Sequence, residues 1–108
     1  MIDWGRVQEL QTEIGPDCFG EIVALFLEEA DDVISRLRAL ADARSLENDL
    51  HFLKGSALNL GFSDLARICQ NGEREAASGS VDVAIETVIE IYQKSRSAFL
   101  GGINGVAA

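Results

Sequence analysis

The sequence predicts an all-α protein, an antiparallel up-down-up-down four-helix bundle with a short additional N-terminal helix. Three observations predict this fold class. The composition is rich in strong helix formers and includes one proline, which favours helix over strand. Apolar residues recur three and four positions apart along most of the chain. The links between these periodic segments are about two to three residues long, so consecutive helices must be antiparallel neighbours.

Size and charge narrow the range of functions. A chain of 108 residues is expected to form one domain. Its net charge of −9 argues against nucleic-acid binding, which needs clustered Lys and Arg. The first residues carry no basic segment followed by an apolar run, and no apolar stretch is long enough to span a bilayer. A cytoplasmic location is therefore expected, with Cys18 and Cys69 as buried, reduced thiols.

The first two predicted helices meet at Gly15-Pro16. Val7, Leu10 and Ile14 give the first helix one apolar face, and the proline suits the first turn of the next. The second helix is predicted from Pro16 to about Ala43, with Leu25 and Leu27 as additional apolar residues beside its seam. That seam comprises Phe19, Ile22 or Val23, Phe26, Ala30, Val33, Leu37 and Leu40.

The remaining helices are predicted from caps and glycine stops. The third begins near Ser45 and ends at Gly61, and the fourth begins at Ser63 and ends at Gly79. Gly72 occupies a position in the fourth helix where the pattern calls for an apolar side chain. Ser80 is expected to cap the last helix, whose stripe includes Val81, Ile85, Val88, Tyr92 and Phe99. Residues 1–100 are thus the predicted domain, and residues 101–108 a flexible tail.

The third helix is predicted to have two distinct faces. At about 100° per residue its core face comprises Leu46, Leu50, Leu53, Ala57 and Leu60. A second stripe, roughly 130° away by the same arithmetic, comprises His51, Lys54, Gly55 and Leu58. His51 is the only histidine in the chain. Its position predicts a surface imidazole rather than a core one.

The residue types in this stripe favour a phosphoryl carrier. A neutral imidazole is a nucleophile near neutral pH. Lys54, one turn later, is expected to disfavour the protonated ring and to offset the charge of a phosphoryl group. Gly55 weakens the helix but clears room beside His51. The stripe lacks the further ligands of a metal site and the partners of an acyl-transfer triad, and no glycine-rich ATP loop occurs in the chain.

The segment from His51 to Gly61, HFLKGSALNLG, resembles the signature of histidine-containing phosphotransfer (HPt) domains of the bacterial single-domain type. Phe26-Leu27-Glu28-Glu29-Ala30 resembles the family's preceding helix, and Leu65 to Cys69 with Glu73 resembles the following one; Gly72 departs from the family's larger residue. The resemblance implies that His51 is phosphorylated, that Lys54 assists electrostatically and that Gly55 gives access. Ser56 and Asn59 are assigned to packing or capping, on the far side from His51.

The resemblance also implies the partners. These are response-regulator receiver domains or a hybrid sensor histidine kinase, with the receiver supplying the aspartate and Mg²⁺ and this chain binding no cofactor of its own. Leu58, Phe62 and Leu27 are the expected docking residues of a monomeric phosphocarrier without kinase activity. Three alternatives stay open: an adaptor that docks without carrying phosphate, a dimeric phosphotransferase like the helical core of sensor kinases, and a purely structural bundle.

Overall fold

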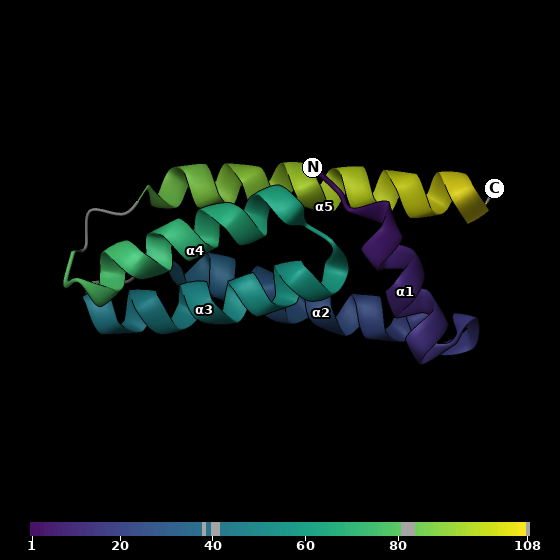
Figure 1. The fold of residues 1–108 in the computed structure, drawn as a ribbon, viewed down its shortest axis with the longest axis horizontal. Coiled ribbons are helices and arrows are strands. Elements are labelled where there is room, and N and C mark those ends of the chain that lie inside the picture. The colour runs from purple at the N-terminus through teal and green to yellow at the C-terminus, as the bar shows by residue number, and fades with distance from the viewer. Residues whose placement is uncertain (38, 40–41, 81–83, 108) are drawn as a thin grey trace.

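The computed structural model describes residues 1–37, 39, 42–80 and 84–107, and these form five helices. They are α1 (Trp4–Ile14), α2 (Pro16–Leu37), α3 (Ala43–Leu60), α4 (Ser63–Ala77) and α5 (Ile85–Ala107). Helices α2 to α5 run alternately in opposite directions along the 45 Å axis of the molecule, and α1 crosses one end of the bundle (Figure 1). The all-α, up-down-up-down prediction is confirmed.

Two of the predicted helix caps are corrected by the structure. Asp42, not Ser45, caps α3, because its carboxylate accepts a hydrogen bond of 2.8 Å from the backbone N–H of Ser45. Phe62 occupies the N-cap position of α4, and the hydroxyl of Ser63 instead donates to the carbonyl of Met1 at 3.0 Å. Helix α2 ends at Leu37, before the predicted end near Ala43.

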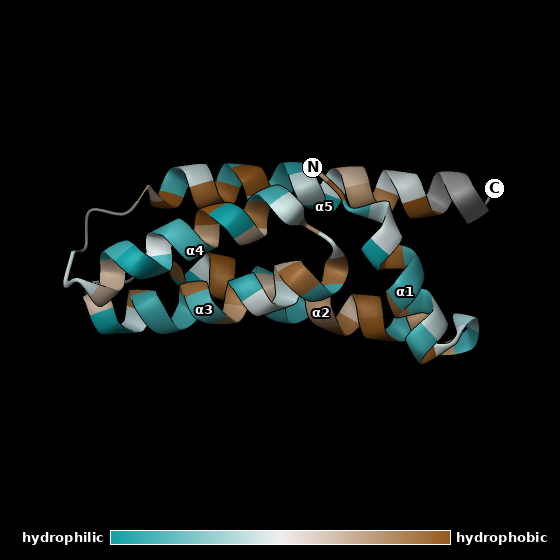
Figure 2. Cartoon of the chain, in the orientation of Figure 1, coloured by the Kyte–Doolittle hydropathy of each residue, from teal (hydrophilic) through white to brown (hydrophobic). Residues whose placement is uncertain are grey.

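The core is formed by the inward stripes of all five helices, and Figure 2 shows apolar segments on the sides of the helices that face the interior. The predicted core face of α3 is confirmed, because all five of its residues are buried. On α2 the seam passes through Leu27, while Phe26 is only half-buried at its margin. The predictions for Leu40 and Val81 fall outside the described residues.

The N-terminal segment is tied to the turn between α3 and α4. The Asp3 N–H donates to the carbonyl of Gly61 at 2.7 Å, and the Ser63 N–H donates to the carbonyl of Met1 at 3.1 Å. Gly61 has φ of 78°, and a Cβ there would lie 2.6 Å from the Asp3 carbonyl oxygen. Glycine is therefore required both by the left-handed turn and by the close approach of the N-terminal segment. These contacts fix the end of α3.

The C-terminal segment differs from the prediction. Helix α5 continues to Ala107, so the expected irregular structure from residue 101 is wrong for residues 101–107. Ile103 packs on the core, and the Trp4 ring stacks on Phe99 with centroids 6.1 Å apart. A side chain at Gly102 would collide with the Trp4 ring. The adjacent glycines Gly101 and Gly102 suggested a flexible tail, but the absence of a side chain at Gly102 lets the Trp4 ring pack there.

Two further predictions concern the thiols and the membrane. Cys69 is buried as expected, but Cys18 is exposed, because it lies outside the seam of α2. Within the described residues, no helix combines the length and apolar character that crossing a bilayer would require. Gly72 is buried in α4 and lines a small hollow together with Ala84 and with Val88 of α5.

Candidate functional site

His51 lies on the solvent side of α3, as its place in the helical pattern predicts. Its side chain is 68% exposed, whereas the flanking Leu50 and Leu53 are completely buried. The buried leucines fix the rotation of α3 in the bundle. They therefore hold the imidazole at the surface on a rigid helix.

Glu73 of α4 joins His51 and Lys54 into one polar cluster. One carboxylate oxygen, Oε2, lies 2.8 Å from Nδ1 of His51, and the other, Oε1, lies 2.8 Å from Nζ of Lys54. Glu73 and Lys54 are both mostly buried, with side chains 20% and 24% exposed. In the sequence, Glu73 was noted only as part of a helix that resembles the family, and its contact with His51 was not predicted. The two residues are 22 positions apart on different helices, so no local pattern indicates the contact.

The charge of Glu73 sets the chemistry of the imidazole. The Lys54 ammonium, followed by the hydrogen bond from His51, lowers the pKa of Glu73 below its ordinary value of 4.5. An ionised carboxylate only accepts hydrogen bonds, so Nδ1 of His51 carries a proton in this pairing. In the nucleophilic form of the ring the lone pair is then on Nε2, which has no hydrogen-bond partner among the residues the structure describes. The cluster thus presents one nucleophilic nitrogen to solvent.

The structure modifies the expected role of Lys54. The sequence predicted that its ammonium disfavours the protonated imidazole and offsets the charge of a phosphoryl group. Instead the Glu73 carboxylate contacts both groups, and it offsets the influence of Lys54 on His51. A positive charge beside the ring is therefore balanced by a negative one. Lys54 remains within the cluster, paired with Glu73 at 2.8 Å.

Cys69, one turn before Glu73 on α4, does not add a second nucleophile. Burial, and secondarily the charge of Glu73, raise the pKa of its thiol to about 12. The thiolate is the reactive form of cysteine, and this side chain is fully buried. Among the described residues no group of three or more His, Cys, Asp or Glu is arranged to hold a metal ion.

An open groove of about 300 Å³ lies beside His51, between α2 and α3. A Cβ built at Gly55 meets no atom within 4 Å, so bundle packing does not require a glycine there. Ser56 and Asn59 also line this groove, which corrects their assignment to the far side of the helix. Ser56 is buried, in agreement with the packing role predicted for it. The full lining is Phe26, Glu29, His51, Phe52, Gly55, Ser56 and Asn59.

The three expected docking residues lie in different environments. Leu58 is 58% exposed and is available to a partner. Leu27 and Phe62 are buried and do not line the groove beside His51, so their assignment to a docking surface around His51 is wrong: Leu27 belongs to the α2 seam, and Phe62 packs edge-on against Phe99. Phe52, 42% exposed beside His51, was not singled out in the sequence. Its position directly after the histidine was the signal that it borders the site.

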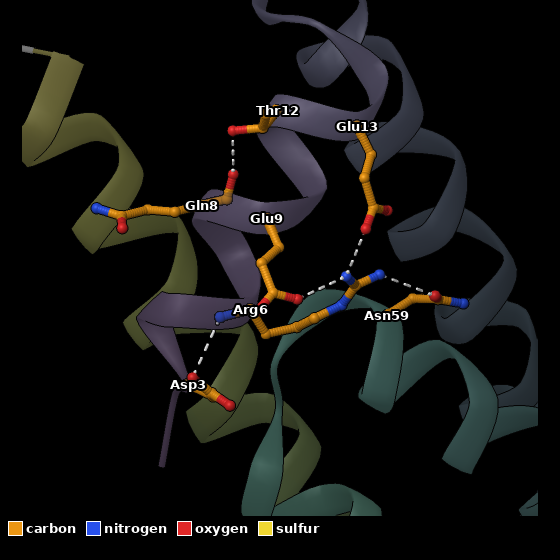
Figure 3. A network of polar contacts seen from close by, with 7 residues as sticks. All are labelled: Asp3, Arg6, Gln8, Glu9, Thr12, Glu13 and Asn59. Atoms are coloured by element: carbon orange, nitrogen blue, oxygen red, sulfur yellow. Dashed lines mark hydrogen bonds and ion pairs between the residues drawn. The ribbon is translucent and has the colours of Figure 1, made fainter.

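Helix α1 extends the polar surface around the site. Arg6 forms ion pairs of 3.3 and 3.2 Å with Glu9 and Glu13, and it donates to the side-chain oxygen of Asn59 at 3.5 Å. Figure 3 shows Arg6 reaching from α1 across to Asn59 on α3. This contact links the short N-terminal helix to the groove beside His51. The sequence did not reveal it, because the two residues are 53 positions apart.

The fold and the site define an all-α bundle that presents a single oriented histidine on its surface. Comparison with known proteins identifies the family. The model of the Hpt domain matches residues 21–98, and the chain belongs to the Hpt domain family. It is also 28% identical, over 69 residues, to the histidine-containing phosphotransfer protein 1 of Arabidopsis thaliana. That match covers 59% of this chain and 45% of the relative. No solved structure gives a significant match.

Proposed function

We propose that this protein carries a phosphoryl group on His51 in a phosphorelay, exchanging it with the aspartate of response-regulator receiver domains. The observation that carries the proposal is the pairing of His51 with Glu73. The carboxylate holds Nδ1 at 2.8 Å and leaves Nε2 open on an exposed side chain. Membership of the Hpt domain family and similarity to a histidine-containing phosphotransfer protein support the same function.

Transfer of the phosphoryl group from the receiver to His51 needs no additional proton donor. The lone pair of Nε2 attacks the phosphorus of the receiver's aspartyl phosphate, and a bond forms between Nε2 and phosphorus as the bond to the aspartate oxygen breaks. The receiver regains its carboxylate, and the His51 ring, which keeps its proton on Nδ1, becomes cationic. The ionised Glu73 carboxylate lies 2.8 Å from that nitrogen and stabilises the new charge. The reverse step returns the group to a receiver.

Lys54 and Gly55 have distinct parts in this proposal. The Lys54 ammonium lies 2.8 Å from the carboxylate that contacts His51, so it is held near the ring and offsets the charge of the incoming phosphoryl oxygens. Gly55 keeps the space beside the ring empty, so a receiver can bring its aspartate to Nε2. Because the imidazole is already held on a rigid helix, this protein loses little conformational entropy when a receiver docks.

The partner would supply the rest of the chemistry. We propose that the receiver contributes the aspartate and Mg²⁺, while this chain acts as a monomeric phosphocarrier and transfers no phosphate from ATP itself. Phe52 and Leu58 are the large exposed apolar side chains near His51, and they are proposed to contact the receiver. A relay must bind transiently, so the interface is expected to be small and weak.

Transfer from a phosphorylated receiver tests the function. The receiver is labelled with radioactive phosphate, freed of the phosphodonor and mixed with wild-type protein or with His51→Gln. The proposal expects acid-labile, base-stable label on the wild type and none on the variant. Circular dichroism of His51→Gln verifies its fold, since the side chain is exposed. Label on a folded His51→Gln protein, or no transfer to the wild type from any receiver of the source organism, would overturn the proposal.

A further inference from the structure

A second groove lies between α2 and α5. Its volume is about 430 Å³, larger than that of the groove beside His51. Apolar side chains from both helices line it, among them Val23, Leu27, Leu100 and Ile103. The core of the bundle thus reaches the surface along this seam, where α2 and α5 do not close over it.

This groove faces away from the phosphotransfer site. At about 100° per residue, Gly20, Ala24 and Asp31 point to one side of α2, and Phe26 and Glu29 point roughly 170° away. The first three residues line the second groove, and the last two line the groove beside His51. The two grooves therefore lie on opposite sides of the same helix. A molecule bound in one does not cover the other.

Gly20 keeps part of the second groove open. A Cβ built there meets no atom within 4 Å, so neither the core nor a neighbouring helix requires a glycine at this position. A glycine inside a helix destabilises it by about 1 kcal/mol relative to alanine. Gly55 shows the same combination beside His51. In both places the bare backbone widens a groove that bundle packing leaves open.

The rim of the second groove is acidic. It carries Glu28, Asp31 and Asp32 against a single base, Arg96. Arg96 is committed to Asp31, with Nε 3.3 Å from Oδ1, and Tyr92 donates its hydroxyl to the same carboxylate. Glu28 and Asp32 are exposed, have no ion-pair partner among the described residues and lie four positions apart, where like charges repel. Positive charge supplied from outside would relieve that repulsion.

The acidic rim indicates which kind of molecule the α2–α5 groove can bind. A second copy of the chain would bring a net charge of −9 to the same acidic rim, and anionic lipid or nucleic acid would be repelled in the same way. The groove follows α2 from Gly20 to Asp32, a distance of about 18 Å. A basic amphipathic helix fits both the apolar lining and the acidic rim, because it presents apolar residues one turn apart with Lys and Arg on either side of them.

We infer that the α2–α5 groove is a second docking surface, which binds a basic amphipathic helix of a partner protein and leaves His51 free for phosphotransfer. The apolar lining receives the helix's apolar face, and Glu28 and Asp32 pair with its basic side chains. Such a surface allows a partner to hold the carrier in place while receivers exchange phosphate at the opposite face. The binding of a helix in this groove does not depend on the proposed phosphotransfer, since it rests on different residues; only the benefit to the relay does.

Binding of a designed peptide tests this surface. The probe is a fluorescent Leu/Lys helix of about 14 residues, with leucines on one face, and the controls are a scrambled peptide of the same composition and a Leu/Glu helix. Fluorescence anisotropy should show binding of the first peptide only. NMR chemical shifts of the labelled protein should move at Gly20, Ala24 and Ile103 and not at His51 and Gly55.

Two charge-reversal variants, one in the groove and one outside it, test whether the peptide binds to this surface. Glu28→Lys should weaken peptide binding about fivefold or more, whereas Glu47→Lys, the same change on α3, should alter it less than twofold. Equal weakening by both variants would show attraction to net charge alone, and shifts centred on His51 would place the peptide in the other groove. Light scattering that shows a dimer broken by Glu28→Lys would assign the groove to a second copy. Each of these results, or no binding at all, overturns the inference.

Discussion

The Glu73 carboxylate of α4 lies 2.8 Å from Nδ1 of His51 on α3. This contact fixes which ring nitrogen carries the proton and which one is exposed as a nucleophile. The same carboxylate pairs with Lys54 at 2.8 Å. A single acidic side chain thus connects the two residues that the sequence motif brings to one helix face.

Replacing Glu73 should slow phosphotransfer without unfolding the protein. Glu73→Gln keeps an oxygen that accepts from Nδ1 but loses the charge, so the rate should fall about fivefold; Glu73→Ala loses both and should fall about tenfold or more, the scale of one charge-assisted hydrogen bond. Rapid-quench transfer from a labelled receiver measures both. Glu75→Gln, an exposed residue of the same helix, is the control, and equal rates in all four proteins would contradict the role of Glu73.

The ion pair between Glu73 and Lys54 should make stability depend on pH in acid. The pKa of Glu73 is lowered by Lys54 and His51 below 4.5. A carboxyl group whose pKa falls on folding stabilises the protein above its unfolded pKa, and that stabilisation disappears as pH falls through the folded pKa. Denaturation by urea should therefore show wild type about 0.5 kcal/mol more stable than Glu73→Gln at pH 7. The difference should shrink as the pH falls below 4.5 and through the folded-state pKa of Glu73, and a difference that stays constant as the carboxylate is protonated would contradict this prediction.

Substitution of Gly55 should separate stability from function. The open space at this position admits a side chain, so Gly55→Gln should stabilise the protein by about 0.5–1 kcal/mol through helix propensity. The same side chain would occupy the approach to His51 and should slow transfer from a receiver. Gly101→Ala, another open glycine, should stabilise the protein without changing the rate. If Gly55→Gln is more stable than wild type and accepts phosphate from a receiver at the same rate, Gly55 is not needed for access to His51.

The exposed and buried apolar residues should respond differently to truncation. Leu58→Ala should weaken receiver binding with little change in the free energy of unfolding, because the side chain is 58% exposed. Leu27→Ala and Phe62→Ala should each cost about 2–5 kcal/mol of stability, since both side chains are buried. Urea denaturation and binding titrations distinguish the two effects. Strong destabilisation by Leu58→Ala would show that Leu58 packs within the bundle.

The contact between Trp4 and Gly102 should be sensitive to one methyl group. Gly102→Ala places its Cβ into the Trp4 ring, so the indole must move and stability should fall by about 1–3 kcal/mol. Trp4 is the only tryptophan, and its fluorescence therefore reports the displacement directly. Gly101→Ala is the neighbouring control. An unchanged spectrum and stability in Gly102→Ala would contradict the packing of α1 on the C-terminal part of α5.

The helices and the exposed histidine could be predicted because they depend on short-range periodicity. The spacing of Leu50, Leu53 and His51 determines which side of α3 is buried. Contacts between helices were not visible in the pattern: Glu73 meets His51, and Arg6 meets Asn59, only after the bundle has assembled. The misassignment of Leu27 has the same origin, because Phe26 and Leu27 fit the α2 period nearly equally well, and packing decides between them.

The end of α5 was mispredicted for a related reason. Two adjacent glycines favour a flexible tail by propensity alone. The structure uses Gly102 to seat Trp4, a residue almost the whole chain away. Tertiary packing here outweighs local propensity, and no local pattern records it.

The most direct test of the central claim is to locate the phosphoryl group by NMR. The phosphorylated protein, labelled with ¹⁵N, gives long-range proton–nitrogen correlations that distinguish the two nitrogens of the His51 ring. Because Nδ1 is held by Glu73, the proposed mechanism predicts phosphorus on Nε2 and a retained proton on Nδ1. Phosphorus on Nδ1, or on any residue other than His51, would contradict it.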